Sequence, residues 1–154
     1  MLSLFLLACD RPTADLQSVV SSDPRNAGLS FGVDCEEYLS CDTLTLDVLS
    51  TGGSPADVSR VFFQFAETQK DESYEKVYLA AKGVPKFYVT GAYFKQVGVD
   101  YPTENPVYLL NHLPENVENL DGSPAFETWT GGWLGVATRQ MEDIVSLHRQ
   151  WWGQ

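Results

Sequence analysis

Positive charge is scarce in this chain. Its 154 residues include 10 Lys and Arg against 21 Asp and Glu, so the formal net charge is −11 at pH 7. Nucleic-acid binding relies on clustered Lys and Arg that neutralise phosphates, and adsorption to anionic lipid relies on polybasic segments. The composition therefore argues against both of these partners. The dispersed negative charge is typical of a surface that keeps a folded domain in solution.

Long apolar runs and familiar catalytic motifs are also absent. No stretch approaches the roughly 20 apolar residues that a membrane-spanning helix needs. The sequence holds no G-x-S-x-G, H-E-x-x-H or Walker A motif, each of which would indicate a specific chemistry. Only two histidines occur, and both His112 and His148 have apolar neighbours, which favours structural roles over catalysis or ligation. We therefore predict no cofactor and no metal site.

Cysteine is scarce as well, and the first of the three cysteines has a distinctive context. The stretch Leu6-Leu7-Ala8-Cys9 resembles the lipobox of bacterial lipoproteins. This resemblance implies cleavage after Ala8, a lipid on Cys9 that anchors the protein to the membrane, and a place in the bacterial cell envelope. Asp10 resembles the signal that retains enteric lipoproteins in the inner membrane.

The segment before Cys9 departs from the usual secretion signal, in which Lys or Arg precedes an apolar run of about 7–15 residues. Here the run from Met1 is shorter and carries no cation. Either the true start lies upstream, or the segment is not a signal. In the second case the protein is soluble and cytosolic, and Cys9 is an ordinary buried thiol.

The other two cysteines form an even pair if Cys9 carries lipid. In an oxidising envelope we expect Cys35 and Cys41 to form a disulfide across a turn. In the cytosol they would be two reduced thiols. A zinc site is not expected, because no second pair of ligands lies near this C-x5-C spacing.

Hydrophobic periodicity predicts one α+β domain over residues 28–154, after a signal remnant at 1–8 and a polar tether at 9–27 with at most one helical turn. The expected fold is an antiparallel sheet from two β-hairpins with a helix between them, followed by C-terminal helices, with one face of the sheet covered. The expected strands are 28–39, 43–50, 77–81 and 87–89, and the expected helices are 55–69, 92–99 and 134–152. Residues 107–110 fit either a helix or a strand, and residues 115–124 are expected to form a loop.

The last helix has the clearest helical spacing. Its apolar positions predict one stripe that faces the core, with Trp133 at its edge. The stripe comprises Leu134, Ala137, Met141, Ile144, Val145, His148 and Trp152.

The most unusual stretch is Trp129-Thr130-Gly131-Gly132-Trp133, in which two tryptophans flank a turn that leads into this helix. Glycines allow a ligand to approach the backbone, and a helix N-terminus offers free N–H groups. The Trp rings can stack on a sugar or an aromatic group. We therefore take these five residues as a candidate ligand-binding site. The alternative is that both Trp side chains cap the core around a tight turn.

A catalytic alternative would use Glu127, Asp143 and His148 near the same turn. Two carboxyl groups can catalyse glycoside hydrolysis when their separation is suitable. Glu142 and Asp143 cannot form such a pair, because adjacent residues on a helix point about 100° apart. Convergence of Glu127, Asp143 and His148 in one concave site would favour an envelope hydrolase, whereas their dispersal would favour a binding protein.

The second half of the chain, over about residues 75–152, resembles a group of uncharacterised bacterial proteins that end in a similar Trp-rich helix. The resemblance implies no activity. The matching stretches are Lys86-Phe87-Tyr88, Tyr93-Phe94, Asn105-Pro106-Val107-Tyr108, Trp129-Thr130-Gly131-Gly132, Gln140-Met141-Glu142-Asp143 and Gln150-Trp151.

Taken together, these features favour a lipid-anchored envelope protein without catalysis that binds a protein partner or a small ligand. An envelope hydrolase and a soluble cytosolic protein with a misread start are the alternatives.

Overall fold

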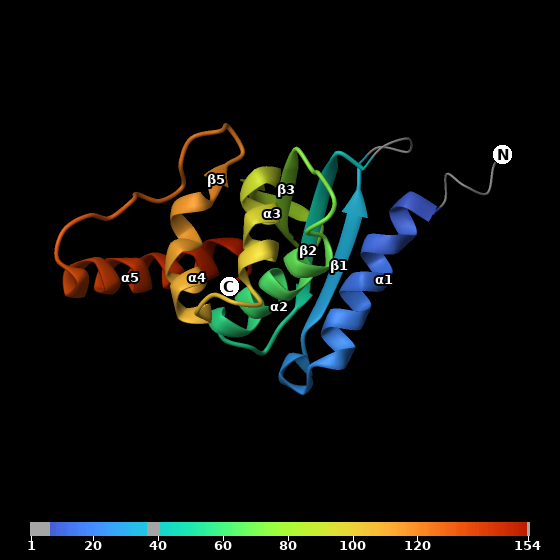
Figure 1. Ribbon diagram of the computed structural model, residues 1–154, viewed down its shortest axis with the longest axis horizontal. Coiled ribbons are helices and arrows are strands. Elements are labelled where there is room, and N and C mark those ends of the chain that lie inside the picture. Colours follow the sequence, from blue (N-terminus) through green and yellow to red (C-terminus); the bar gives the residue numbers. More distant parts are fainter. Residues whose placement is uncertain (1–6, 37–40, 154) are drawn as a thin grey trace.

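The computed structural model describes the backbone of residues 7–36 and 41–153, and side chains from Arg11 onward within these ranges. Within the described residues, a five-stranded sheet with strand order β1-β2-β3-β4-β5 packs against helices, which confirms the predicted α+β class (Figure 1). The elements are α1 (Leu7–Ser22), η1 (Pro24–Asn26), β1 (Ser30–Cys35), β2 (Thr43–Ser50), α2 (Pro55–Thr68), β3 (Lys76–Ala81), β4 (Val84–Thr90), α3 (Gly91–Asp100), α4 (Pro106–His112), η2 (Pro114–Asn116), β5 (Glu118–Asn119) and α5 (Trp133–Trp151).

The two predicted hairpins are present, and they are joined through a parallel pair of strands. β1 pairs with β2, and β3 with β4, in the antiparallel sense, whereas β2 and β3 run parallel. Parallel neighbours require a crossover connection, which α2 provides. Along β2, Leu44, Leu46 and Val48 are buried and alternate with less buried residues, so one face of the sheet carries the core.

Helix α2 begins where its sequence predicts. The Ser54 side chain accepts the N–H of Asp57 over 3.3 Å, and the Asp57 carboxylate accepts the N–H of Ser54 over 2.8 Å. This reciprocal capping satisfies N–H groups that a helix start otherwise leaves free. The helix then buries Phe62 and Phe65 against Phe94 of α3, with ring centroids 5.5 and 5.9 Å apart. These rings form the centre of the core.

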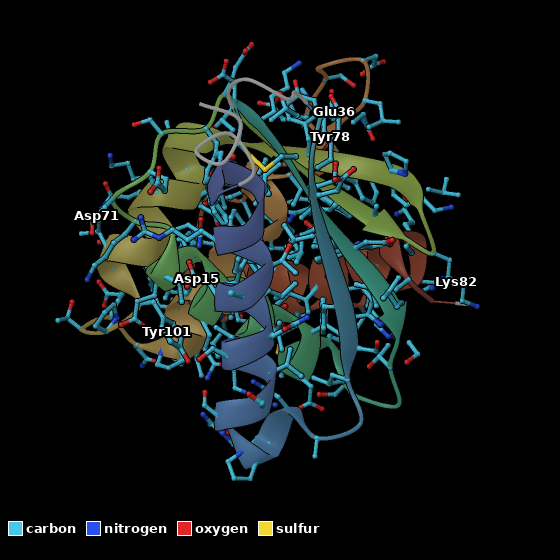
Figure 2. All side chains as sticks on the ribbon, turned by 90° about the vertical axis from the view of Figure 1, so that its right-hand side faces the viewer. Asp15, Glu36, Asp71, Tyr78, Lys82 and Tyr101 are labelled. Atoms are coloured by element: carbon cyan, nitrogen blue, oxygen red, sulfur yellow. A yellow bond between two sulfur atoms is a disulfide. The ribbon has the colours of Figure 1, made fainter. Side chains whose placement is uncertain are left out.

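The N-terminal segment differs from its prediction. The prediction placed a signal remnant at 1–8 and a tether with at most one helical turn at 9–27, whereas residues 7–22 form the helix α1. Pro12, Leu16 and Val19 are buried and lie on one helical face at spacing i, i+4, i+7. Figure 2 shows α1 lying alongside β1. The polar residues between these three positions conceal the stripe in the sequence.

A buried asparagine fixes the turn between α1 and β1. Asn26 is fully buried, and its amide group donates to the Val19 carbonyl (3.1 Å) and to the Gln64 side chain (2.8 Å). Its carbonyl oxygen accepts a 3.0 Å hydrogen bond from Arg60 of α2. Because buried polar groups need such partners, this network ties the end of α1 to α2. From Pro12 onward the expected tether is therefore packed against the domain.

The segment 107–110, which fits either a helix or a strand on sequence alone, is helical. Residues 106–112 form α4, and the side chain of Asn105 caps this helix by accepting the N–H of Val107 over 2.9 Å. Within the segment expected to be a loop, Glu118 and Asn119 form the short strand β5, which pairs with β4.

Helix α5 crosses the end of the sheet, and its first half extends away from the body of the molecule (Figure 1). Near its other end, Trp151 is 1% exposed and donates its indole N–H to the carbonyl of Ala80 in β3 over 2.9 Å. This contact fixes the C-terminal half of α5 on the sheet. Among the described helices, none combines the length and the apolar character that a bilayer crossing requires.

Candidate functional site

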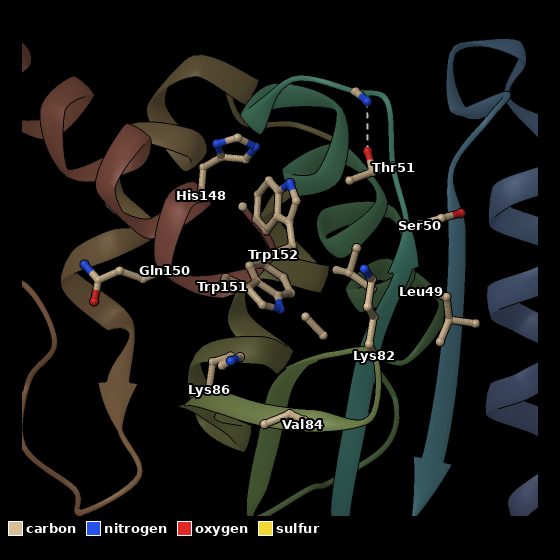
Figure 3. A pocket seen from close by; sticks show the side chains of 14 residues that line it. Leu49, Ser50, Thr51, Lys82, Val84, Lys86, His148, Gln150, Trp151 and Trp152 are labelled. Atoms are coloured by element: carbon tan, nitrogen blue, oxygen red, sulfur yellow. Dashed lines mark hydrogen bonds between the residues drawn. The ribbon is translucent and has the colours of Figure 1, made fainter.

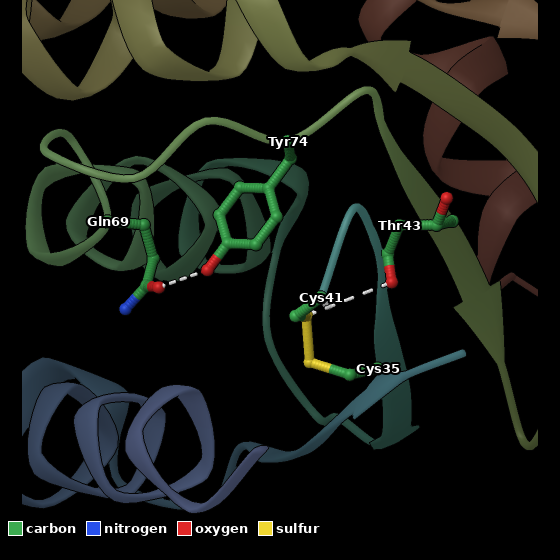
Figure 4. Close-up of a disulfide and its surroundings, with 5 residues drawn as sticks. All are labelled: Cys35, Cys41, Thr43, Gln69 and Tyr74. Carbon is green, nitrogen blue, oxygen red and sulfur yellow. Dashed lines mark hydrogen bonds between the residues drawn. A yellow bond between two sulfur atoms is a disulfide. The ribbon is translucent and has the colours of Figure 1, made fainter. Parts of the chain in front are cut away.

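The predicted pairing of Cys35 with Cys41 is confirmed. The two residues are joined by a disulfide at the end of the β1–β2 hairpin, with Cα atoms 5.2 Å apart (Figure 4). Nearby, the Tyr74 hydroxyl donates a 2.6 Å hydrogen bond to Gln69, and burial raises the pKa of Tyr74 to about 12. Cys41 and Tyr74 line one cavity, together with charged side chains that include Arg11 and Glu72. The side chain of Cys9, the predicted lipidation site, lies outside the described residues.

The face of α5 that packs on the core is not the predicted one. The buried residues of this helix are Gln140, Ile144, Leu147 and Trp151, at spacing i, i+4, i+7, i+11. Met141 and Val145, which were predicted to be core residues, are 62% and 49% exposed. That prediction was wrong, because the true buried face is rotated by about one residue, or about 100°.

A second apolar stripe lies on the solvent side of α5. Leu134, Met141 and Val145 are 64%, 62% and 49% exposed, and their spacing of i, i+7, i+11 places them on one face. We call these three residues the outer stripe. Trp133, at the start of the helix, is 78% exposed. It therefore does not cap the core, as the simpler interpretation of the Trp-rich turn required.

The two tryptophans of the candidate turn have different environments. Trp129 is half-buried against α5: its indole N–H donates to the Asp143 carboxylate over 2.7 Å, and the Arg139 guanidinium lies 4.6 Å from its ring centroid. Gly131 has a φ of +122°, a conformation that favours glycine. Thr130, Gly131 and Gly132 are all exposed. The turn is thus attached to α5 through Trp129 and presents Trp133 to solvent.

The three residues of the catalytic alternative do not meet in the cavity that His148 lines. Asp143 is engaged by Trp129, and Glu127 is exposed. His148 lines a cavity near the C-terminal end of α5 whose lining includes neither Glu127 nor Asp143. The other histidine, His112, pairs with Glu115 over 2.6 Å and contacts the Tyr108 ring at a centroid distance of 4.2 Å. The arrangement gives no support to a two-carboxylate hydrolase.

The cavity that His148 lines was not anticipated from the sequence. Its volume is about 750 Å³, and it lies between the end of β2, the β3–β4 turn and the last turn of α5 (Figure 3). The His148 ring contacts Trp152 edge-on at a centroid distance of 4.4 Å. Burial, and to a lesser extent the neighbouring Arg149, lowers the pKa of His148, so its ring is neutral at pH 7. The charged side chains in the lining are Lys82 and Lys86.

The β3–β4 turn that carries Lys82 has an unusual backbone. Lys82 and Gly83 have φ values of 49° and 81°, and Lys82 is the single non-glycine residue with positive φ in the described part of the chain. Two consecutive positive φ values are typical of type I′ hairpin turns, in which Asn or Gly is preferred at the first position. A Lys-Gly turn between two strands is the sequence signal that could have identified this position.

Among the side chains that the structure describes, at residues 11–36 and 41–153, no group of three or more His, Cys, Asp or Glu is arranged to hold a metal ion. Comparison of the chain with protein-family models, with curated proteins and with solved structures finds no match.

Proposed function

We propose that this chain is a lipid-anchored cell-envelope protein that performs no catalysis and binds a protein partner through the outer stripe of α5 and Trp133. The observation that carries the proposal is the second apolar stripe. A surface helix of a globular domain normally has one apolar stripe, which faces the core. In α5 the core takes Ile144, Leu147 and Trp151, and the outer stripe is left in solvent.

The composition of this surface suits an interface. Aromatic residues and Met are enriched at the centres of protein interfaces, and Trp is among the commonest residues that dominate binding energy. Fully burying one large apolar side chain is worth about 1.5–3 kcal/mol. Trp133, Leu134, Met141 and Val145 together therefore offer enough surface for a specific contact, which an isolated exposed residue would not.

The attachment of the preceding turn supports the same proposal. The Trp129 contacts with Arg139 and Asp143 hold the chain before α5 against the helix. Such preorganisation lowers the entropic cost of association. The candidate site Trp129–Trp133 is thereby reassigned from a small-ligand site to the edge of a protein interface.

The envelope location rests on two features of the cysteines. Leu6-Leu7-Ala8-Cys9 resembles a lipobox, and the remaining pair, Cys35 and Cys41, is joined by a disulfide. Stable disulfides are rare in the cytosol and common outside it. A lipid on Cys9 would hold the domain at the membrane, and Asp10 favours the inner membrane if the enteric rule applies.

Site-specific photocross-linking in intact cells of the native host tests the protein partner. A photoreactive benzoylphenylalanine replaces Met141 in one variant and Val99 in another. Val99 is a matched control, because it is an apolar residue of α3 that is 52% exposed and lies outside the outer stripe. We expect a discrete cross-linked species from position 141 and none from position 99.

The cross-link should disappear when Leu134→Glu is added, since a charge in the stripe disfavours its burial. An adduct of twice the chain mass would identify a second copy as the partner. Absence of any adduct from position 141, or equal adducts from positions 141 and 99, would show that the outer stripe is not an interface.

A further inference from the structure

The cavity at the end of the sheet has a charge opposite to that of the whole protein. The chain carries 21 acidic residues against 10 Lys and Arg, yet the cavity is lined by Lys82 and Lys86 and by no Asp or Glu. Neither lysine forms an ion pair with any residue that the structure describes. The nearest acidic group on the adjoining strand, Asp47 of β2, accepts the N–H of Gly83 over 2.9 Å. Its carboxylate is thus used to hold the turn.

The backbone at Lys82 gives an independent reason to assign a function to this turn. A non-glycine residue with φ near +50° is uncommon, and Asn is much better suited than Lys to this conformation. Breaches of such local preferences are expected at functional sites. Keeping a lysine here places an ammonium group at the cavity, as Figure 3 shows, where it lies on the β3–β4 side opposite Trp152.

The aromatic side chains of His148 and Trp152 line the cavity as well. The Trp152 indole N–H is buried and has no hydrogen-bond acceptor among the described residues, although buried donors are nearly always paired. Trp152 and His148 also present aromatic surface on the same side of the cavity. The cavity volume of about 750 Å³ lies within the range of small-molecule sites.

We propose that this cavity binds a small organic phosphate, in which the phosphate group contacts Lys82 and Lys86 and a flat ring packs against Trp152. A phosphate monoester carries nearly two negative charges at pH 7, which two ammonium groups match, and lysine is a common phosphate ligand. The site is distinct from the outer stripe, so this proposal does not depend on the protein partner proposed above.

Phenyl phosphate is a suitable probe, and the readout is the indole N–H resonance of Trp152 in a 15N-labelled sample of the full chain. We expect this resonance to shift on titration, and the affinity to fall as salt is raised, because the contact is ionic. Inorganic phosphate lacks the ring, and benzyl alcohol lacks the charge, so both should bind at least about tenfold more weakly, or about 1.4 kcal/mol.

Substitution of Lys82 and of Lys86 tests whether their ammonium groups contact the phosphate. Lys82→Asn preserves the turn and should raise the melting temperature, because Asn suits the left-handed backbone, while it weakens phenyl phosphate binding about fivefold or more. Lys86→Gln should weaken binding similarly without any gain in stability. Lys95→Gln is the matched control, since this exposed lysine of α3 does not line the cavity, and it should bind as the unmodified protein does.

The proposal is overturned if phenyl phosphate leaves the Trp152 resonance unchanged at millimolar concentration. It is equally overturned if Lys82→Asn and Lys86→Gln bind as tightly as the unmodified protein, or if Lys95→Gln loses as much affinity as they do. None of these outcomes bears on the photocross-linking result for the outer stripe, so the two proposals fail or hold separately.

Discussion

The indole N–H of Trp129 donates a 2.7 Å hydrogen bond to the carboxylate of Asp143, which lies about three turns into α5 from Trp133. The Arg139 guanidinium covers the same ring at 4.6 Å. One side chain of the loop is thus held by an anion and a cation from a single helix face. The contact explains how a loop that contains two glycines keeps a defined path before α5.

Trp129→Ala should therefore cost stability, whereas Trp133→Ala should not. A hydrogen bond to a charged group contributes about 1.5–3 kcal/mol when buried, and a cation–π contact about 0.5–1 kcal/mol at an exposed site. Because Trp129 is half-buried, we expect a loss of about 1–2 kcal/mol on denaturant unfolding. Trp133 is 78% exposed, so its variant should change stability by less than about 0.5 kcal/mol. Equal losses in the two variants would contradict this contact as the reason.

Ile144→Ala and Met141→Ala test which face of α5 is buried. Ile144 is 9% exposed and Met141 is 62% exposed. Truncation of a buried Ile costs about 2–5 kcal/mol, and the lower end applies here because some exposure remains. The same truncation at Met141 should cost less than about 0.5 kcal/mol. Chemical denaturation of both variants is the measurement, and a large loss at Met141 would restore the register predicted from the sequence.

The sequence predicted the elements of the sheet well but not the orientation of α5, and the physical reason is specific. Strand residues such as Leu44 and Leu46 alternate strictly, so their period alone identifies the buried face. Helix α5 instead has two apolar stripes about 100° apart, and the prediction merged Met141 and Val145 of one stripe with Ile144 of the other. Periodicity alone cannot show which of the two stripes is buried, because that depends on the side of the helix on which the sheet lies.

The candidate sites could also be predicted from the sequence only where they depend on residues close together in the chain. The bridge between Cys35 and Cys41 was predicted from their short spacing together with the expected oxidising compartment, and both of these can be read from the sequence. The cavity at the end of the sheet joins Lys82 from a hairpin turn to Trp152 from the last helix, and these residues meet through tertiary packing alone. Likewise α1 was taken for a tether, because its three buried residues are dispersed among polar ones and need β1 to cover them.

The disulfide should stabilise the hairpin by a modest amount. Cys35 and Cys41 are separated by 6 positions in the sequence, and closing so short a loop restricts the unfolded chain by about 2 kcal/mol on the chain-entropy model. The double variant Cys35→Ser with Cys41→Ser should therefore lose about that much stability. Thiol labelling of the denatured native protein, without reductant, should detect neither cysteine. Two labelled thiols in that sample would show that the bridge does not form in the cell.

Acidification should weaken the fold in part through His148. Burial, and to a lesser extent the positive charge of the neighbouring Arg149, lowers the pKa of His148 in the folded state. As the pH falls through about 6.5, the unfolded chain takes up a proton that the folded chain does not, so stability decreases. His148→Gln should therefore lose less stability than the unmodified protein between pH 7 and pH 5, a range that spans the ordinary histidine pKa of about 6.5. The acidic residues are the same in both proteins, so their contribution to the pH dependence cancels when the two stability curves are subtracted. Parallel curves of stability against pH would contradict the role of His148.

The lipid anchor is tested by Cys9→Ser. A lipid on Cys9 would insert acyl chains into the membrane, and each buried CH2 contributes about 0.8 kcal/mol to binding, so several chains hold firmly. The net charge of −11 disfavours adsorption to anionic lipid, so loss of the lipid should release the protein. We expect the unmodified protein in the membrane fraction and Cys9→Ser in the supernatant. Mass spectrometry of the purified unmodified protein should show a lipid on Cys9, and a mutant that stays membrane-bound with its mass unchanged would rule out the lipobox interpretation.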